Sequence, residues 1–477
     1  MQVFKKRSKI VATIGPASRN KATLTELVKA GANVFRMNFS HGTHDDHRKV
    51  IDLVQQVNEE LGTHVCLLQD LQGPKIRVSK VENDGVEIES GNKLIITTEE
   101  LLGTSQRVST VYKGITDDVK AGDSILIDDG NIEVQVEKVT GNDVHTRIVH
   151  GGLLKSRKGI NLPDSKVSAP SLTEKDIEDL EFGMQFDLEW VALSFVRSAK
   201  DILELKARLT KHGCKSKVVA KIEKPEALEN MDEIIDATDA IMVARGDLGV
   251  EIPMEKVPIE QKRLVKKCNR LGKPVIIATQ MMESMIENPR PTRAETNDVA
   301  NAVMDGADAL MLSAESASGK FPVHAVRSMA KTIAEVEKST NSIYHKYWDK
   351  EKEASTTRLN DLLVRAACRM SESVKAKAMV GMTKSGYTGY KLAMHRPKAD
   401  IFLFTSDRFL LRQASLIWGV NAFYFDEQKS IDDTLQSIEK KLVAMGYLEK
   451  GDVFINTASM PSHWKGHTNM MKVNLVE

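Results

Sequence analysis

Short runs of apolar residues recur along the first two thirds of the chain, and a polar stretch follows each run. Eight such runs begin near Ile10, Val34, Val65, Trp190, Val218, Ala240, Pro274 and Ala309. Runs of about four to six apolar residues, many of them β-branched, are typical of strands buried on both faces of a parallel sheet. Six of the seven spacings between runs are roughly 22 to 35 residues, which suits one strand, one helix and their loops. The pattern therefore predicts an α/β fold, a (β/α)8 TIM barrel.

The segments between the runs carry signals for helix starts. Thr23 followed by Glu26, and Ser171 followed by Glu174, each have the spacing of a capping box. We therefore expect helices of the barrel wall to begin at Thr23 and at Ser171.

The interval between the third and fourth runs exceeds the others by about 95 residues, which is enough for a separate domain. Within it, Ile132–Glu137 alternates between apolar and polar residues, with turn signals on both sides, as a half-buried strand does. We predict a small antiparallel β domain, an inserted β-barrel, over residues 73–170. It would lie as a lid on the C-terminal face of a barrel built from residues 1–72 and 171–345.

A third region begins after a charged stretch near 346–357, which we interpret as a linker. Apolar residues from Leu359 to Val374 recur at helical spacing, and four more apolar runs follow with helix-like segments between them. This alternation predicts a smaller C-terminal α/β domain over residues 346–477.

Composition narrows the functional classes. Lys plus Arg number 67 and Asp plus Glu number 66, so the net charge of +1 gives no general attraction to nucleic acid or to an anionic membrane. The 4 cysteines are far apart in the sequence, which fits a reducing compartment and gives no zinc motif. The N-terminal segment lacks the apolar region of a secretory signal, and no apolar stretch has the length of a membrane span. We expect a cytoplasmic enzyme without nucleic-acid or membrane partners.

Polar residues that close the apolar runs are the candidates for chemistry, because the active sites of such barrels lie at the C-terminal ends of the strands. Glu223 and Asp247 close neighbouring runs and could together hold one Mg²⁺ ion, with positions left for water and substrate oxygens. Lys221 lies two positions before Glu223, so in a strand both side chains point the same way. A lysine beside such a metal can stabilise an enolate or a transferring phosphoryl group. Arg36 and Arg77 offer forked donors for phosphate.

Each of these residues also has a structural explanation. A Lys-x-Glu in a strand is more often an ion pair on a solvated face, Asp247 could be a helix N-cap, and His41 could be a loop residue without a role. Only their common position at one end of one predicted barrel favours the functional interpretation.

The order and spacing of nine motifs resemble one family over nearly the whole chain. The motifs are KIVATIGPAS, RMNFSHG, DLQGPKIR, KGINLP, SLTEKD, AKIEKPEAL, MVARGDLGVE, ATQMMESM and MLSAES. They resemble the pyruvate kinases of bacteria. The resemblance implies transfer of the phosphoryl group of phosphoenolpyruvate to ADP, giving pyruvate and ATP in glycolysis. It further implies Mg²⁺, with Mn²⁺ as an acceptable substitute, a homotetramer, and activation by a phosphorylated metabolite.

By motif position, the resemblance also implies roles for single residues. The implied metal ligands are Glu223 and Asp247. The residues implied to bind substrate are Arg36, Lys221, Gly246, Asp247 and Thr279. The implied catalytic groups, with the last two on the proton route, are Lys221, Thr279 and Ser313. The residues implied to contact nucleotide or its phosphates are Asn38, His41, Arg77 and Lys158.

The sequence departs from the family pattern where many members bind K⁺. The region corresponds to Asn38, Ser40, Asp70, Leu71 and Lys75. Leu71 stands where K⁺-binding members have threonine, and Lys75 stands where they have glutamate, a pattern similar to the K⁺-independent branch. We expect that K⁺ is not required, because the Lys75 ammonium would supply its charge. The alternative is that Lys75 points to solvent and that backbone oxygens still bind K⁺.

The third domain matches the family's effector domain. The residues implied to bind the phosphate of an effector are Thr383, Lys384, Ser385, Gly386 and Thr388. Hydroxyls and backbone N–H groups between a strand and a helix suit a phosphate, although without the resemblance they would read as a capped turn. A sugar monophosphate and AMP are both candidates for the effector.

Two other functions remain open from the sequence. A Mg²⁺-dependent barrel lyase could use the same metal and lysine to stabilise an enolate, although the predicted lid with Lys158 and Arg77 argues for a nucleotide. A non-catalytic metabolite sensor would be expected to lack one of the catalytic residues, and all of them are present.

Overall fold

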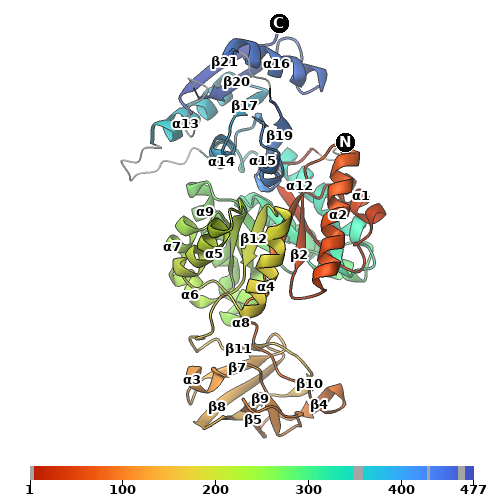
Figure 1. Cartoon of the computed structure of the whole chain (residues 1–477), viewed down its shortest axis with the longest axis vertical. Helices are drawn as coiled ribbons and strands as arrows, with labels where there is room; N and C mark the ends of the chain where they lie inside the picture. The colour runs from red at the N-terminus through yellow and green to blue at the C-terminus, as the bar shows by residue number, and fades with distance from the viewer. Residues whose placement is uncertain (1–4, 347–357, 427–429, 460–467) are drawn as a thin grey trace.

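The computed structural model describes residues 5–346, 358–426, 430–459 and 468–477, so most of the predicted linker lies outside the described residues. Three bodies are stacked along the long axis of the molecule (Figure 1). The β/α barrel is in the middle, the inserted β domain is at one end, and the C-terminal α/β domain is at the other. Among the described residues, no helix is both long and apolar enough to cross a bilayer.

The eight apolar runs form the eight parallel strands of a closed barrel, which confirms the predicted fold. The strands are β1 (Lys9–Ile14), β2 (Val34–Asn38), β3 (Cys66–Asp70), β12 (Trp190–Leu193), β13 (Lys217–Ile222), β14 (Ala240–Ala244), β15 (Val275–Ala278) and β16 (Ala309–Leu312). The ring runs in chain order and closes between β1 and β16. The helices around the barrel are α1 (Lys21–Ala30), α2 (His44–Leu61), α4 (Glu174–Gly183), α5 (Ala199–Lys211), α6 (Pro225–Glu229), α7 (Met231–Ala237), α8 (Arg245–Glu251), α9 (Val257–Leu271), α10 (Arg293–Asp305), α11 (Ala314–Ala317) and α12 (Pro322–Ser339).

Both predicted helix starts are wrong by two or three residues. Helix α1 is capped by Asn20, whose side chain accepts a hydrogen bond from the N–H of Thr23 at 2.9 Å. Asparagine caps at least as well as threonine, and the earlier start adds further residues to the helix. Helix α4 uses the overlapping capping box of Thr173 and Asp176. The second carboxylate oxygen of Asp176 also accepts a hydrogen bond from the N–H of Gly73 at 3.0 Å, which favours a helix start at Thr173 over one at Ser171.

The insertion is a small β domain, as predicted. Its elements are β4 (Gly85–Ile88), β5 (Lys93–Thr97), β6 (Arg107–Ser109), α3 (Ile115–Asp118), β7 (Ser124–Ile127), β8 (Ile132–Thr140), β9 (Asp143–His150), β10 (Gly152–Lys155) and β11 (Ile160–Asn161). Six strands form one sheet in the order β11-β7-β8-β9-β5-β6, and β10 pairs with β4. Val78 N donates to Lys158 O at 2.8 Å and Ser79 N donates to Ser109 O at 2.7 Å, so the segment after the first connection bonds to the chain at both edges of this sheet.

The strand directions of the insertion differ from the prediction in one place. All sheet pairs are antiparallel except β5 with β6, which are parallel. The cause is the connection between them, because the chain crosses over instead of turning back in a hairpin.

The C-terminal domain has the predicted alternation of strands and helices. Its elements are α13 (Arg358–Ser373), β17 (Ala378–Met382), α14 (Tyr387–Met394), β18 (Asp400–Thr405), α15 (Arg408–Gln413), β19 (Val420–Tyr424), α16 (Ile431–Ala444), β20 (Val453–Ala458) and β21 (Met470–Leu475). Strand β21 is an additional antiparallel edge strand. It lacks a continuous apolar run because much of it is exposed, with Val473 and Leu475 open to solvent.

The C-terminal domain closes the N-terminal end of the barrel. Leu416 packs among the residues that fill the barrel interior, such as Val11 and Trp190. The Nε1 of Trp190 donates to Gln413 O at 3.3 Å, and Nζ of Lys9 donates to Val420 O at 2.8 Å. The opposite end of the barrel, where the strands finish, therefore remains for the insertion to cover (Figure 1).

Arg396 of the C-terminal domain forms a buried ion pair with Asp308 of the barrel at this junction. Its guanidinium contacts Asp308 at 2.9 Å and Asn269 at 2.7 Å, and it is 2% exposed. Removing one partner leaves a buried charge unpaired, so we expect Arg396→Leu to lower the free energy of unfolding by about 3 kcal/mol. The matched change Arg208→Leu breaks an exposed pair with Glu204 and should cost under about 1 kcal/mol. Thermal unfolding monitored by calorimetry compares the two, and equal shifts would contradict the expectation.

Candidate active site

Lys221 lies at the C-terminal end of β13 and is surrounded by polar groups from three strands. Its Nζ is 2.9 Å from Glu223 Oε1, 2.7 Å from Ser194 Oγ and 3.4 Å from Asp70 Oδ1. The lysine and both carboxylates are almost completely buried. The predicted pair of Lys221 and Glu223 is therefore part of a converging cluster and is not on a solvated face.

The charges in this cluster include both attractive and repulsive pairs. Burial alone would lower the pKa of Lys221, but Asp70, Glu223 and Asp247 outweigh it and raise that pKa above its ordinary value. Burial raises the pKa of Glu223, Lys221 opposes this, and Asp247 raises it further. Lys221 is therefore a permanent cation, while Glu223 and Asp247 repel each other in a way that a bound cation would relieve.

Arg36 is fixed beside this cluster. Its Nε donates to Asp70 Oδ2 at 2.5 Å and its Nη1 donates to Thr13 Oγ1 at 3.1 Å. Burial raises the pKa of Asp70, but Lys221 and Arg36 outweigh burial and hold the pKa below its usual range. Asp70 thus remains ionised and orients two cations, which suits binding of a dianionic phosphate.

The residues present fit a hard divalent cation. Glu223 Oε2 accepts a hydrogen bond from Phe195 N at 2.7 Å, which fixes its orientation, and Asp247 lies in the first turn of α8 and lines the cleft. Among the described residues, no group of three or more His, Cys, Asp or Glu side chains could hold a metal. Two carboxylates with open positions are the arrangement typical of Mg²⁺, which keeps water and substrate oxygens as further ligands.

Thr279 adopts a backbone conformation that a β-branched residue rarely takes. Its φ is 69°, in the left-handed region. Its Oγ1 accepts a hydrogen bond from Gly246 N at 2.7 Å and donates to Ala278 O at 2.6 Å, while Arg245 Nη2 donates to its carbonyl at 2.8 Å. Such strain persists only where the surroundings hold it, and it clusters at active sites.

The loop after β16 is tied to the loop after β15. Glu315 accepts hydrogen bonds from Ser313 N at 2.6 Å and from Met282 N at 3.1 Å. The predicted proton-route residues Thr279 and Ser313 therefore lie on adjoining, mutually braced loops. Their hydroxyls are not joined by a direct hydrogen bond within the described part of the chain.

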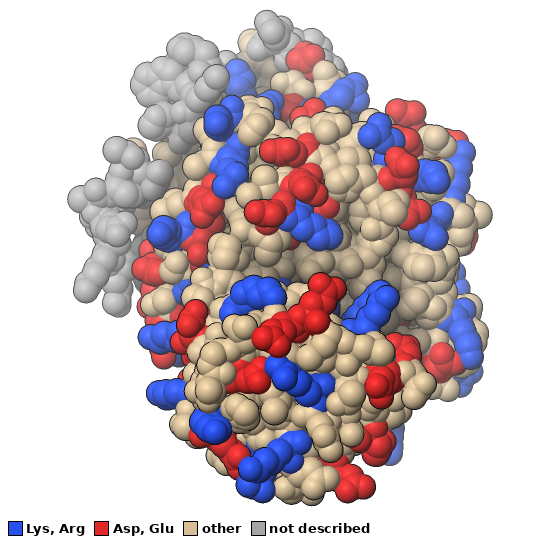
Figure 2. All heavy atoms as spheres, turned by 60° about the horizontal axis from the view of Figure 1, so that its bottom comes forward, with Lys and Arg blue, Asp and Glu red and all other residues tan. Residues whose placement is uncertain are grey.

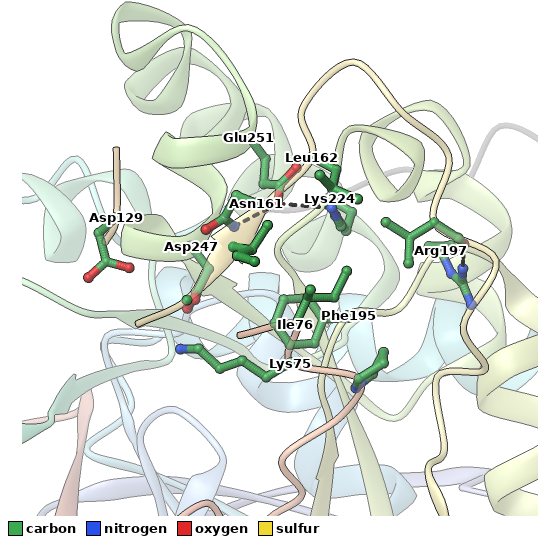
Figure 3. Close-up of a pocket in the computed structure, with 14 residues that line it drawn as sticks. Lys75, Ile76, Asp129, Asn161, Leu162, Phe195, Arg197, Lys224, Asp247 and Glu251 are labelled. Atoms are coloured by element: carbon green, nitrogen blue, oxygen red, sulfur yellow. Dashed lines mark hydrogen bonds and ion pairs between the residues drawn. The ribbon is translucent and has the colours of Figure 1, made fainter. Parts of the chain in front are cut away.

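A partly open cleft lies between the insertion and the barrel (Figure 3). Lys75, Asp129 and Asp247 line it, and the ammonium of Lys75 points to the side of the cleft where Asp247 lies. Figure 2 shows the end of the molecule that carries the insertion, where basic and acidic residues are interspersed.

The predicted nucleotide-binding residues come together only in part. Burial lowers the pKa of His41, and the positive charges of Arg77, Lys75 and Arg36 lower it further, so these four residues share one positively charged corner. Lys158, from the insertion, forms an ion pair with Asp128 at 2.6 Å.

The predicted monovalent-cation region is close-packed. Asn38 Oδ1 accepts a hydrogen bond from Ser40 N at 3.1 Å, and the Asp70 carboxylate is engaged by Arg36 and Lys221. Leu71 is 1% exposed and packs into the apolar layer around the barrel. Lys75 lines the cleft instead of extending freely into solvent.

The predicted effector residues form the turn between β17 and α14. Gly386 has a φ of 81°, and Thr383 Oγ1 accepts hydrogen bonds from Ser385 N at 3.3 Å and Gly386 N at 2.9 Å. Lys384 and Ser385 are exposed. Thr388 is buried, and its hydroxyl bonds to that of Thr468 at 2.9 Å.

Several residues of the site were not among the predicted ones. Ser194 directly follows β12 and Glu315 lies three positions after the end of β16, so the rule that selected the other candidates also points to these two residues. Arg245 also follows its strand, and it positions Thr279 while paired with Asp298 at 2.8 Å. Asn161 and Glu251 carry no signal in the sequence, because only the packing of the insertion brings them together.

The fold defines a protein of the β/α barrel class, and the residues at the C-terminal ends of its strands fit an enzyme that binds phosphate and a divalent metal. The chain matches the sequence model of "Pyruvate kinase, barrel domain" over residues 5–326 and that of "Pyruvate kinase, alpha/beta domain" over residues 361–474. It is 42% identical to the pyruvate kinase of Geobacillus stearothermophilus over 476 residues, covering 99% of this chain and 81% of that protein. It is likewise 42% identical to the pyruvate kinase of Staphylococcus aureus strain MRSA252 over 474 residues, covering 99% and 80%. The chain belongs to the pyruvate kinase family.

Proposed function

We propose that this chain performs the reaction of its family at Lys221 and the polar side chains around it, here called the Lys221 cluster. It is a phosphotransferase that takes phosphoenolpyruvate and ADP as substrates and forms pyruvate and ATP. The observation that supports this location best is the buried Lys221 ammonium among Glu223, Asp70 and Ser194, next to Arg36. A lyase acting through an enolate would not need the positive corner of Arg36, Lys75 and Arg77 under an inserted lid.

The geometry suggests a division of labour. Lys221 and Arg36 would bind oxygens of the phosphoryl group, and Lys221 would stabilise the enolate oxygen as the bond from that oxygen to phosphorus breaks. A β-phosphate oxygen of ADP forms the new bond to phosphorus. The enolate then takes up a proton at its terminal carbon, for which Thr279 and Ser313 are the candidate route. Gly246, Asp247 and Thr279 would hold the carboxylate end of the substrate.

The family uses a divalent metal ion, and we propose that this ion is Mg²⁺, held by Glu223 and Asp247. When bound, it supplies positive charge to the oxygens of the substrate and of the transferring group. Mn²⁺ has the same preference for oxygen ligands and should substitute.

The requirement for ADP tests the reaction. Pyruvate formation is measured with phosphoenolpyruvate and Mg²⁺, with ADP present or omitted. The proposal predicts pyruvate only with ADP present and in equal amount to the ATP formed. Pyruvate released without ADP would point to a lyase or phosphatase, and none in either sample would favour the metabolite sensor.

We propose that K⁺ is not required, because Lys75 provides its charge in the cleft. The wild-type chain should reach its full rate in K⁺-free buffer. Lys75→Glu reverses the charge and should lower that rate at least about tenfold, with partial recovery on adding K⁺. Lys320→Glu is the control, because Lys320 forms an exposed pair with Glu287 and does not line the cleft. A wild-type chain that needs K⁺ would contradict the role of Lys75 but not the reaction.

We further propose that the turn of Thr383, Lys384, Ser385 and Gly386 binds the phosphate of an activator, with Lys384 as the cationic partner. Thr388 would act by holding the turn through Thr468. The resemblance to the family supports a homotetramer, which sedimentation analysis would test. Four unpaired cysteines, three of them buried, support a reducing compartment such as the cytoplasm.

A further inference from the structure

Two connecting segments join the insertion to the barrel, and barrel residues contact both of them. The first connection passes Gly73, where φ is 69° and a Cβ would lie 2.9 Å from the Phe195 ring. On the returning connection, Arg197 donates to the carbonyl oxygens of Val167 and of Ala169, the latter at 2.6 Å. The two connections are therefore held in place next to the barrel. The position of the sheet of the insertion depends on other contacts.

One hydrogen bond joins a strand of the insertion to the barrel among the residues that the structure describes. Asn161, at the end of β11, donates through Nδ2 to Glu251 Oε1 at 2.8 Å. The same oxygen is 2.8 Å from Nζ of Lys224. The side chains of Glu251 and Lys224 are 1% and 8% exposed, and Glu251 Oε2 is buried with no hydrogen-bond partner among the described residues. The Asn161 latch, meaning Asn161, Glu251 and Lys224, is drawn with its contacts in Figure 3.

The latch connects parts of the chain that carry proposed functional groups. Glu251 is the last residue of α8, whose first turn carries Asp247. Lys224 directly follows Glu223, and Asn161 is three positions beyond Lys158 in the insertion. All three latch residues line or border the cleft between the two domains. The width of the cleft is therefore linked to whether this hydrogen bond is made.

We infer that Asn161 is a positioning residue that latches the insertion over the nucleotide end of the cleft. The inference rests on the proposed function, in which ADP binds beneath the insertion. Glu251 forms an ion pair with Lys224 at 2.8 Å, and a carboxylate accepts an amide N–H more strongly than a neutral acceptor does. One such bond biases the insertion toward the closed position without locking it, so product can still leave.

Asn161→Ala removes the latch and leaves the Glu251–Lys224 pair intact. We expect kcat/KM for ADP to fall about tenfold, since one hydrogen bond to a charged group is lost. Binding of phosphoenolpyruvate in the absence of ADP should change less than about twofold, because Lys221 and Arg36 are untouched. The matched control is Asn142→Ala, which removes a hydrogen bond to Glu99 inside the insertion at 3.4 Å and should leave both quantities unchanged.

Asn161→Asp separates latching from simple loss of packing. Two carboxylates would then face each other, so the defect in kcat/KM for ADP should exceed that of Asn161→Ala at pH 8. A defect no larger than that of Asn161→Ala would contradict the latch.

The distance between insertion and barrel can be measured without turnover. Spin labels at Lys138→Cys and Lys211→Cys, in a Cys214→Ser background, report this distance by electron spin resonance, since the other three cysteines are buried. The latch predicts a longer and broader distance distribution for Asn161→Ala than for the parent or Asn142→Ala. Identical distributions would overturn the inference whether or not the chain makes pyruvate. If the parent shows no activity but Asn161→Ala shows the predicted shift, only the proposed function would be wrong.

Discussion

Replacing Lys221 by methionine should lower kcat by about 10³-fold, the upper range for removing one group that stabilises developing charge. Methionine has a similar length but carries no charge, and the Glu223, Asp70 and Ser194 side chains that surround Lys221 cannot replace it. Binding of phosphoenolpyruvate should weaken much less, because Arg36 remains fixed by Asp70 and Thr13. Initial rates over a range of phosphoenolpyruvate concentrations separate the two effects.

The control for this variant lies on the same strand. Lys217, at the other end of β13, has its ammonium 4.1 Å from the centre of the Tyr390 ring and is remote from the cleft. Lys217→Met should keep kcat within about twofold. If Lys221→Met retained more than a tenth of the wild-type rate while folded, as judged by its thermal midpoint, the central role of Lys221 would be wrong.

Removing either proposed metal ligand should weaken metal binding at least about tenfold, since changes even to groups behind the ligands of metal sites cost about 10- to 100-fold. Asp247→Asn is the cleaner of two such variants, because Glu223→Gln also takes the ion-pair partner from Lys221. The expected result is a higher half-saturating Mg²⁺ concentration for both variants. Direct titration with Mn²⁺, followed by electron spin resonance without substrates, measures affinity independently of catalysis.

Glu229→Gln is the control for the metal variants, because Glu229 is an exposed carboxylate on α6. It should bind Mn²⁺ as the wild type does. Unchanged Mn²⁺ affinity in both Asp247→Asn and Glu223→Gln would place the metal elsewhere.

The barrel could be predicted because a parallel strand that is buried on both faces appears in the sequence as a run of apolar residues. Each of the eight strands contains a short apolar run, and β14 is apolar throughout, from Ala240 to Ala244. The rule that barrel enzymes place chemistry at strand ends then selected Lys221, Glu223 and Asp247. In the structure Lys221 and Glu223 form an ion pair at 2.9 Å, and the charge of Asp247 acts on both. Edge strand β21 was missed because an exposed strand needs no apolar run.

Contacts between distant segments could not be predicted. The capping boxes at Thr23 and Ser171 were plausible locally, but Asn20 is an equally good cap and Asp176 also bonds to Gly73. The strained φ of Thr279 depends on Arg245 and Gly246. The Asn161 latch depends on how the insertion folds back, which no local pattern records.

The most direct test of the account follows the phosphoryl group itself by phosphorus NMR, with phosphoenolpyruvate, ADP and Mg²⁺ in K⁺-free buffer. The account predicts that the phosphoenolpyruvate signal is replaced in equal amount by the γ-phosphate signal of ATP with the wild-type chain, and very slowly with Lys221→Met. Release of inorganic phosphate, or equally fast transfer by Lys221→Met, would contradict it.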